Sequence, residues 1–209
     1  MKKTLIKILG VPGCGKSTML REVDRILRCH NRSIIIVKDK LYTTDDLAEL
    51  KLNPWQNAVI FQQNMIDDFQ SEDKYQQQMK KCENQIVVEH TPIEMIEFFT
   101  AAYKLSGFIT DYGFKYIRNK WYNSSINDDA DKCGYIYVIC SPKDSIENMK
   151  ERKREGEGTV YPFVLDTINH FILAHHDSNK SDFKLVLYYR ENDFHTGELY
   201  AFLTACMNI

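Results

Sequence analysis

The sequence has no apolar run long enough to cross a membrane. A transmembrane helix needs about 18 or more consecutive apolar residues, and no stretch of the 209-residue chain approaches that length. The start of the chain is basic and then apolar, but Leu5–Leu9 is too short for the core of a signal peptide and includes Lys7. We therefore expect a soluble, cytoplasmic protein that does not bind a membrane.

Paired cysteines and surplus positive charge are also lacking. The six cysteines include no C-x-x-C pair, so neither a zinc ribbon nor a disulfide framework is indicated, and reduced thiols fit better. The chain has 27 Lys and Arg against 29 Asp and Glu, which gives a formal net charge of −2. Because it lacks a broad positive field, we do not expect long nucleic acid as a partner.

Short apolar runs rich in β-branched residues alternate with longer stretches of helical spacing. After the first run, Leu20, Val23 and Leu27 recur as they would on one face of a helix. The alternation predicts a doubly wound α/β fold with a parallel sheet, and the length suits a single domain over residues 1–209. The predicted strands are Thr4–Leu9, Ser33–Val37, Gln85–Val88, Tyr135–Cys140 and Phe183–Tyr189.

Prolines and a polar segment mark the borders of these elements. Pro92 and Pro142 are expected to open helices after the third and fourth strands. The segment Asn123–Lys132, rich in Asp and Asn, is predicted to be a surface loop in front of the fourth strand.

A glycine-rich loop follows the first predicted strand. Its sequence, G-V-P-G-C-G-K-S, matches the P-loop pattern G-x-x-x-x-G-K-[ST]. Glycines let successive backbone N–H groups turn toward phosphates, and the following helix adds the positive end of its dipole. The pattern predicts ATP bound with Mg²⁺, with the lysine at the terminal phosphates and the serine on the metal. The predicted ATP-binding residues are Gly10, Gly13, Gly15, Lys16, Ser17 and Thr18.

The P-loop alone does not separate kinases from GTPases and other ATPases. A GTPase should carry an N-K-x-D segment after a late strand, and the sequence has none. The D-x-x-G spacing of Asp131–Gly134 precedes the fourth predicted strand instead of following one, so we interpret it as a coincidence.

A basic segment lies a short distance after Ser141-Pro142. Residues 152–157 read R-K-R-E-G-E, and together with the P-loop they resemble the deoxynucleoside kinase family, whose lid carries R-x-R-x-x-E. The resemblance implies a P-loop nucleoside/nucleotide kinase fold, with a five-stranded parallel sheet flanked by helices and an arginine-bearing lid at about residues 150–160. It implies that Arg152 and Arg154 stabilise the transferred phosphoryl group and that Glu157 binds the 3′-hydroxyl of the sugar.

The end of the third strand is a second point of resemblance. Glu89 matches the acid of the family's E-R-S motif and is implied to hold Mg²⁺ together with Ser17. His90 stands where the family has arginine. We expect His90 to contact the substrate through one hydrogen bond, because imidazole cannot form the bidentate pair of an arginine.

Further substrate contacts are implied on two helical segments. Gln62, with Phe61 beside it, falls where the family glutamine pairs with the edge of the base. Phe99 falls where the family stacks an aromatic ring on the base, although the neighbouring Phe98 is an alternative.

The catalytic base is implied to follow the second strand. The family has a glutamate there, and in this chain Asp39, between two lysines, is the acid at that place. The lysines should keep its carboxylate ionised at neutral pH, ready to accept a proton from a hydroxyl.

The resemblance implies a deoxynucleoside kinase that transfers the γ-phosphate of ATP to the 5′-hydroxyl of a deoxynucleoside. Met65, Phe69 and Met95 would border the base and are bulky and uncharged, so we predict a pyrimidine, thymidine or deoxycytidine. A nucleoside monophosphate kinase of the thymidylate kinase type, a P-loop ATPase or nucleotide switch, and a binding protein without turnover remain alternatives. Whether the chain forms a homodimer stays open.

Overall fold

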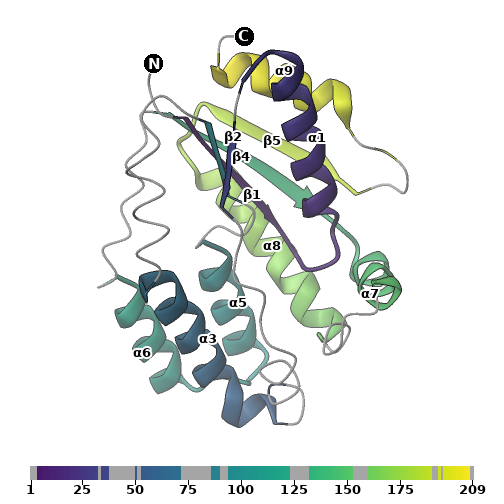
Figure 1. The fold of residues 1–209 in the computed structure, drawn as a ribbon. Helices are drawn as coiled ribbons and strands as arrows, with labels where there is room; N and C mark the ends of the chain where they lie inside the picture. The colour runs from purple at the N-terminus through teal and green to yellow at the C-terminus, as the bar shows by residue number, and fades with distance from the viewer. Residues whose placement is uncertain are drawn as a thin grey trace.

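Five parallel strands form one sheet in the order β2-β3-β1-β4-β5 (Figure 1). The strands are β1 (Thr4–Gly10), β2 (Ile34–Val37), β3 (Ile86–Glu89), β4 (Lys132–Ile139) and β5 (Phe183–Tyr188). This computed structural model describes residues 4–32, 34–37, 50, 53–71, 86–89, 94–122, 132–152, 160–189, 193 and 195–207. The predicted α/β fold is confirmed.

Helices lie on both sides of the sheet (Figure 1). The helices are α1 (Lys16–Cys29), α3 (Pro54–Ser71), α5 (Glu94–Leu105), α6 (Asp111–Tyr122), α7 (Pro142–Glu151), α8 (Pro162–Ser178) and α9 (Thr196–Met207). α1 packs with α9 on one side, and α5 packs with α8 on the other, while α3 and α6 pack on α5 farther from the sheet. In the described part of the chain, no helix combines the length and apolar character that a membrane span requires.

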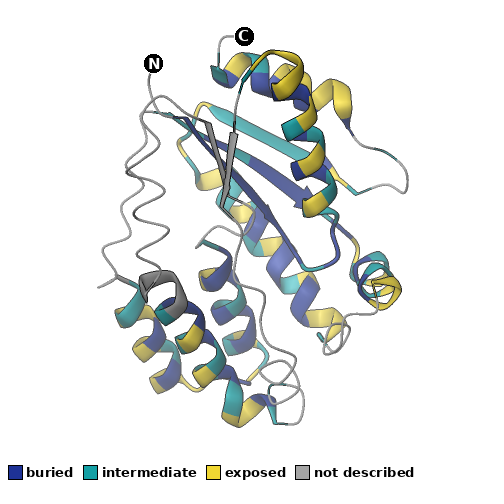
Figure 2. Ribbon diagram, viewed as in Figure 1, coloured by how far each residue is buried: buried dark blue, intermediate teal, exposed yellow. Residues whose placement is uncertain are grey.

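β1 is the centre of the core. Every one of its residues is buried (Figure 2), because strands flank it on both edges and helices cover both faces. A strand enclosed in this way favours a continuous apolar run over an alternating one. The run that predicted this strand was therefore read correctly, and Lys7 is the one charged residue within it.

The borders of β4 differ from the prediction. The strand begins at Lys132, three residues before the predicted Tyr135, and ends at Ile139 instead of Cys140. Its first residues pair in register with Thr4, Leu5 and Ile6 of β1, and Lys132 places its ammonium about 5.5 Å from the centre of the Phe183 ring. Pairing with the neighbouring strand thus overrides the polar composition that indicated a loop up to Lys132.

The buried Lys7 is neutralised by a helix on one side of the sheet. Its Nζ donates to Oε1 of Glu94, the first residue of α5, at 2.6 Å. The Lys7 side chain is 1% exposed and that of Glu94 is 16% exposed, and Tyr135 of β4 places its ring 5.9 Å from the same ammonium. The ion pair therefore joins the central strand to the amino end of α5.

Breaking this ion pair should cost far more than replacing both partners. We expect Lys7→Met to lower the free energy of unfolding by about 3–5 kcal/mol, since it leaves the Glu94 carboxylate buried without its counter-charge. The double variant Lys7→Met/Glu94→Leu should recover most of that loss. Denaturant unfolding of the three proteins measures both effects, and Arg28→Met, at an exposed ion pair with Asp24, serves as the control that should change little. A Lys7→Met protein as stable as wild type would show that the pair does not hold the helix.

Candidate functional site

The P-loop connects the end of β1 to the start of α1, at the carboxyl edge of the parallel sheet. Gly13 and Gly15 have φ angles of 80° and 91°, in the left-handed region that favours glycine. A Cβ at Gly13 would also collide with the backbone carbonyl of Ser145. The two glycines are thus required by the backbone itself, which explains the spacing recognised in the sequence.

Two positive groups lie next to the loop. They are the amino end of α1 and the ammonium of Lys16. α1 begins directly after Gly15, and within the described structure no side chain caps its amino end, so the positive end of the helix dipole is available to an anion. Lys16 Nζ donates to the carbonyls of Gly10 and Val11, at 2.7 and 3.0 Å. The lysine therefore lies over the loop where a phosphate would lie, and Ser17 is exposed beside it.

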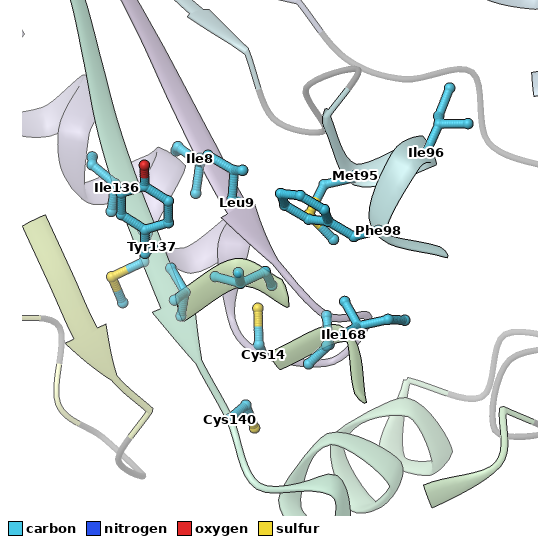
Figure 3. Packing of buried hydrophobic residues seen from close by; sticks show 14 of the residues in the cluster. Ile8, Leu9, Cys14, Met95, Ile96, Phe98, Ile136, Tyr137, Cys140 and Ile168 are labelled. Carbon is cyan, nitrogen blue, oxygen red and sulfur yellow. The ribbon is translucent and has the colours of Figure 1, made fainter. Parts of the chain in front are cut away.

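Cys14 is the part of the loop that faces inward. It is fully buried and belongs, with Cys140, to the hydrophobic core (Figure 3). Burial raises the pKa of its thiol, while the positive charges of Lys16 and Arg152 act in the opposite direction. Cys14 is thus a protonated packing residue.

Side chains of α7 donate hydrogen bonds to the backbone of the P-loop, an arrangement that the sequence did not predict. The helix is capped by Ser141, whose hydroxyl accepts the Asp144 N–H at 3.1 Å. One turn later the hydroxyl of Ser145 donates to the carbonyl of Pro12, and Asn148 Nδ2 donates to the carbonyl of Gly13 at 2.8 Å. Tyr189, after β5, donates its hydroxyl to Asn148 Oδ1 at 3.2 Å. The only sequence signal was the i, i+3 spacing of two polar residues on a helix already expected after Ser141.

Arg152 is exposed and lies at the carboxyl end of α7, where its backbone N–H donates to the Asn148 carbonyl at 3.3 Å. The other predicted lid residues, Arg154 and Glu157, lie outside the described residues, as do Asp39 and His90. Glu89 ends β3, in register with Lys7 of β1 and Val37 of β2. The backbone therefore places Glu89 at the sheet edge that also carries the P-loop.

The residues predicted to meet a base lie on α3 and α5. Gln62 is completely buried, and its Oε1 lies 3.2 Å from the hydroxyl of Thr100. Its Nε2 has no hydrogen-bond partner among the described residues. A buried amide nitrogen without an acceptor is costly, so within the described residues the hydrogen-bonding capacity of this atom is unmet. Phe61, beside it, is half-buried against the core.

The structure distinguishes the two phenylalanines that the sequence left open. Phe98 is 7% exposed and packs edge-on against His175 of α8, with ring centres 5.5 Å apart, and Figure 3 shows it pointing with Met95 toward β1. Phe99 is half-buried and lies 6.1 Å from the Tyr103 ring. Phe98 is therefore a core residue, and Phe99 is the less buried of the two.

Comparison with known proteins adds to this geometry. A family model described as deoxynucleoside kinase matches residues 6–197. The chain belongs to the deoxynucleoside kinase family. No curated protein matches the sequence significantly.

The fold of this deoxynucleoside kinase family member is shared by solved structures of deoxyadenosine kinase from M. mycoides. The structure with the products dCMP and a flexible dCDP is 20% identical, with a TM-score of 0.77, and the match covers 98% of this chain and 100% of that one. The structure with bound dATP is 20% identical, with a TM-score of 0.74 and full coverage of both chains. The structure with bound dCTP is 18% identical, with a TM-score of 0.70 and coverage of 98% of each chain. At these identities the likeness shows the fold.

Loss of the hydrogen bond from Asn148 to the P-loop should lower the affinity of the protein for ATP. We expect Asn148→Ala to weaken ATP binding by about 3- to 10-fold, since it removes the hydrogen bond that holds the Gly13 carbonyl. Asn148→Asp should weaken it further, because a carboxylate cannot donate to a carbonyl and adds negative charge near the phosphates. Calorimetric titration with ATP measures both, and Glu147→Ala, at an exposed neighbour, is the control. Equal ATP affinity in Asn148→Ala and wild type would contradict the role given to this contact.

Proposed function

We propose that this protein transfers the γ-phosphate of ATP to the 5′-hydroxyl of a deoxynucleoside. The P-loop carries the proposal: two left-handed glycines, an uncapped helix end and Lys16 surround one position at the carboxyl edge of the sheet. Phosphoryl transfer depends on positioning and charge stabilisation more than on covalent chemistry, and these groups suit both. Family membership supports a nucleoside as the acceptor.

Lys16 would leave the loop carbonyls and bind the terminal phosphates of ATP. Arg152 approaches from the end of α7, and Arg154, two residues farther, would complete the pair that neutralises the transferred group. The donors available for Mg²⁺ are hard oxygens, the Ser17 hydroxyl at the first turn of α1 and the Glu89 carboxylate at the end of β3, and these fit the metal. When bound, Mg²⁺ would add charge neutralisation at the phosphate oxygens.

On the acceptor side, Gln62 would hydrogen-bond the base, and Phe99 would stack on it. Glu157 would bind the 3′-hydroxyl, and His90 would contact the 5′ end of the sugar. We propose a pyrimidine because Met65 and Met95 are bulky, apolar and almost completely buried, at 6% and 1% exposure. The related deoxyadenosine kinase structures hold dCMP, dCTP and dATP, so cytosine is the pyrimidine that these relatives also bind.

A panel of acceptors with ATP and Mg²⁺ tests this function. We expect phosphorylation of deoxynucleosides and little turnover with deoxynucleoside monophosphates or without an acceptor. Among the deoxynucleosides, deoxycytidine or thymidine should have the highest kcat/KM. Lys16→Ala should lower turnover by several orders of magnitude, because it removes the lysine that neutralises the terminal phosphates, while the fold is retained. Preferred turnover of a monophosphate, or acceptor-independent ATP hydrolysis, would overturn the proposal.

Asp39 is the proposed general base, two residues beyond the end of β2. Val37 pairs with Glu89, so the chain leaves β2 at the same sheet edge as the P-loop. We expect Asp39→Asn to lower kcat by about 10²- to 10⁴-fold with little change in ATP affinity, since only the acceptor of the 5′-hydroxyl proton is lost. Asp39→Glu, which restores the family's side chain, should be much milder. Normal turnover by Asp39→Asn together with an inactive Glu89→Gln would move the base to Glu89.

A further inference from the structure

Tyr189 connects the chain that follows β5 to the P-loop. Its backbone N–H donates to the Ile139 carbonyl of β4 at 2.7 Å, which continues the pairing of the two strands one residue past the end of β5. Its hydroxyl donates to Asn148 Oδ1 at 3.2 Å. Its ring also packs against the loop, since two ring carbons lie 3.5 and 3.6 Å from where a Cβ at Gly15 would be. Tyr189 therefore reaches the loop directly at Gly15 and through the side chain of Asn148.

The Asn148 amide is held at both of its ends. Nδ2 donates to the Gly13 carbonyl at 2.8 Å, and Oδ1 accepts the hydrogen of the Tyr189 hydroxyl. A carbonyl oxygen only accepts hydrogen bonds, so the Gly13 end requires the nitrogen and leaves the oxygen for the tyrosine. The two contacts thus demand the same orientation of the amide.

The amide in turn fixes the direction of one peptide unit of the loop. In a planar trans peptide the C=O and the N–H point in opposite directions. Since the Gly13 carbonyl points to α7, the Cys14 N–H of the same unit points away from α7, and it donates to the Val11 carbonyl at 3.3 Å. Lys16 Nζ donates to that same carbonyl at 3.0 Å. The Cys14 N–H is therefore directed to the side of the loop where Lys16 lies.

We propose that Tyr189 is a positioning residue for the phosphates of ATP, which holds Asn148 so that the Gly13–Cys14 peptide unit keeps its N–H turned toward them. Gly13 has a φ angle of 80°, and glycine leaves the peptide units beside it more freedom than any other residue. A peptide unit that must be ordered when ATP binds lowers the affinity, whereas one already held does not. The hydroxyl acts through Asn148, so its effect should disappear when the Asn148 amide is removed.

A double-mutant cycle on ATP affinity tests this chain of contacts. Calorimetric titration with ATP and Mg²⁺ is carried out on wild type, Tyr189→Phe, Asn148→Ala and the double variant. Tyr189→Phe keeps the ring against Gly15 and removes only the hydroxyl, so we expect ATP affinity to fall about 3-fold, as for one hydrogen bond. In the Asn148→Ala background the same change should have no further effect, because the hydroxyl has lost its acceptor.

Two further measurements separate positioning from a general loss of structure. In turnover, Tyr189→Phe should raise the KM for ATP by about 3-fold and leave the KM for the deoxynucleoside unchanged, whereas a disturbed fold would change both. Tyr188→Phe is the matched control, since the Tyr188 side chain is 58% exposed on the neighbouring residue, and it should bind ATP as wild type does.

The inference rests on the proposed function in one respect, that the P-loop binds ATP. Equal ATP affinity in Tyr189→Phe and wild type would overturn the inference alone, as would an equal loss of affinity in the wild-type and Asn148→Ala backgrounds. A wild-type protein that binds ATP but phosphorylates no deoxynucleoside would overturn the proposed function, and the cycle would still decide the inference because it measures binding. A wild-type protein that does not bind ATP would overturn both.

Discussion

A lysine in the middle of the most buried strand imposes the constraint on which the rest of the structure depends. β1 leads into the P-loop, and the Lys7 ammonium within it must be neutralised by a buried acid, because an isolated charge in such a place costs several kcal/mol. Glu94 at the start of α5 is that acid. Since α5 also carries Phe99, one ion pair links the strand that leads to the P-loop with the helix proposed to meet the base.

Hydrogen-bonded polar side chains lie around this ion pair. Tyr137 of β4 hydrogen-bonds to Nδ1 of His175 on α8 at 3.0 Å, and Asn179 donates to the tyrosine oxygen at the same distance. Burial lowers the pKa of His175 and raises that of Tyr137 to about 12. At neutral pH the imidazole is therefore neutral. No second charge competes for Glu94 from these groups, so the carboxylate remains the partner of Lys7.

Sequence reasoning was sufficient where one residue type is required by local chemistry. The P-loop could be recognised because its glycines are needed for backbone angles that other residues avoid. The strands could be recognised because buried parallel strands are mostly apolar, although the start of β4 was placed three residues too late. It was insufficient where the partner is distant in sequence. Lys7 looked only like an interruption of an apolar run, because Glu94 is 87 positions away. The Asn148 contact with the P-loop spans 135 positions, and a polar residue on a helix has no pattern that names such a partner.

The same reasoning explains why the acceptor side was predicted less fully than the donor side. Phosphate is bound by backbone N–H groups and a helix end, so its signature is a continuous motif. A base would be bound by single side chains on separate helices, and Phe98 and Phe99 differ only in their packing, since Phe98 packs against His175. Gln62 could be named as a candidate from the sequence, but the Thr100 hydroxyl that lies 3.2 Å from its Oε1 is 38 positions away. Contacts of this kind form only where α3 packs on α5.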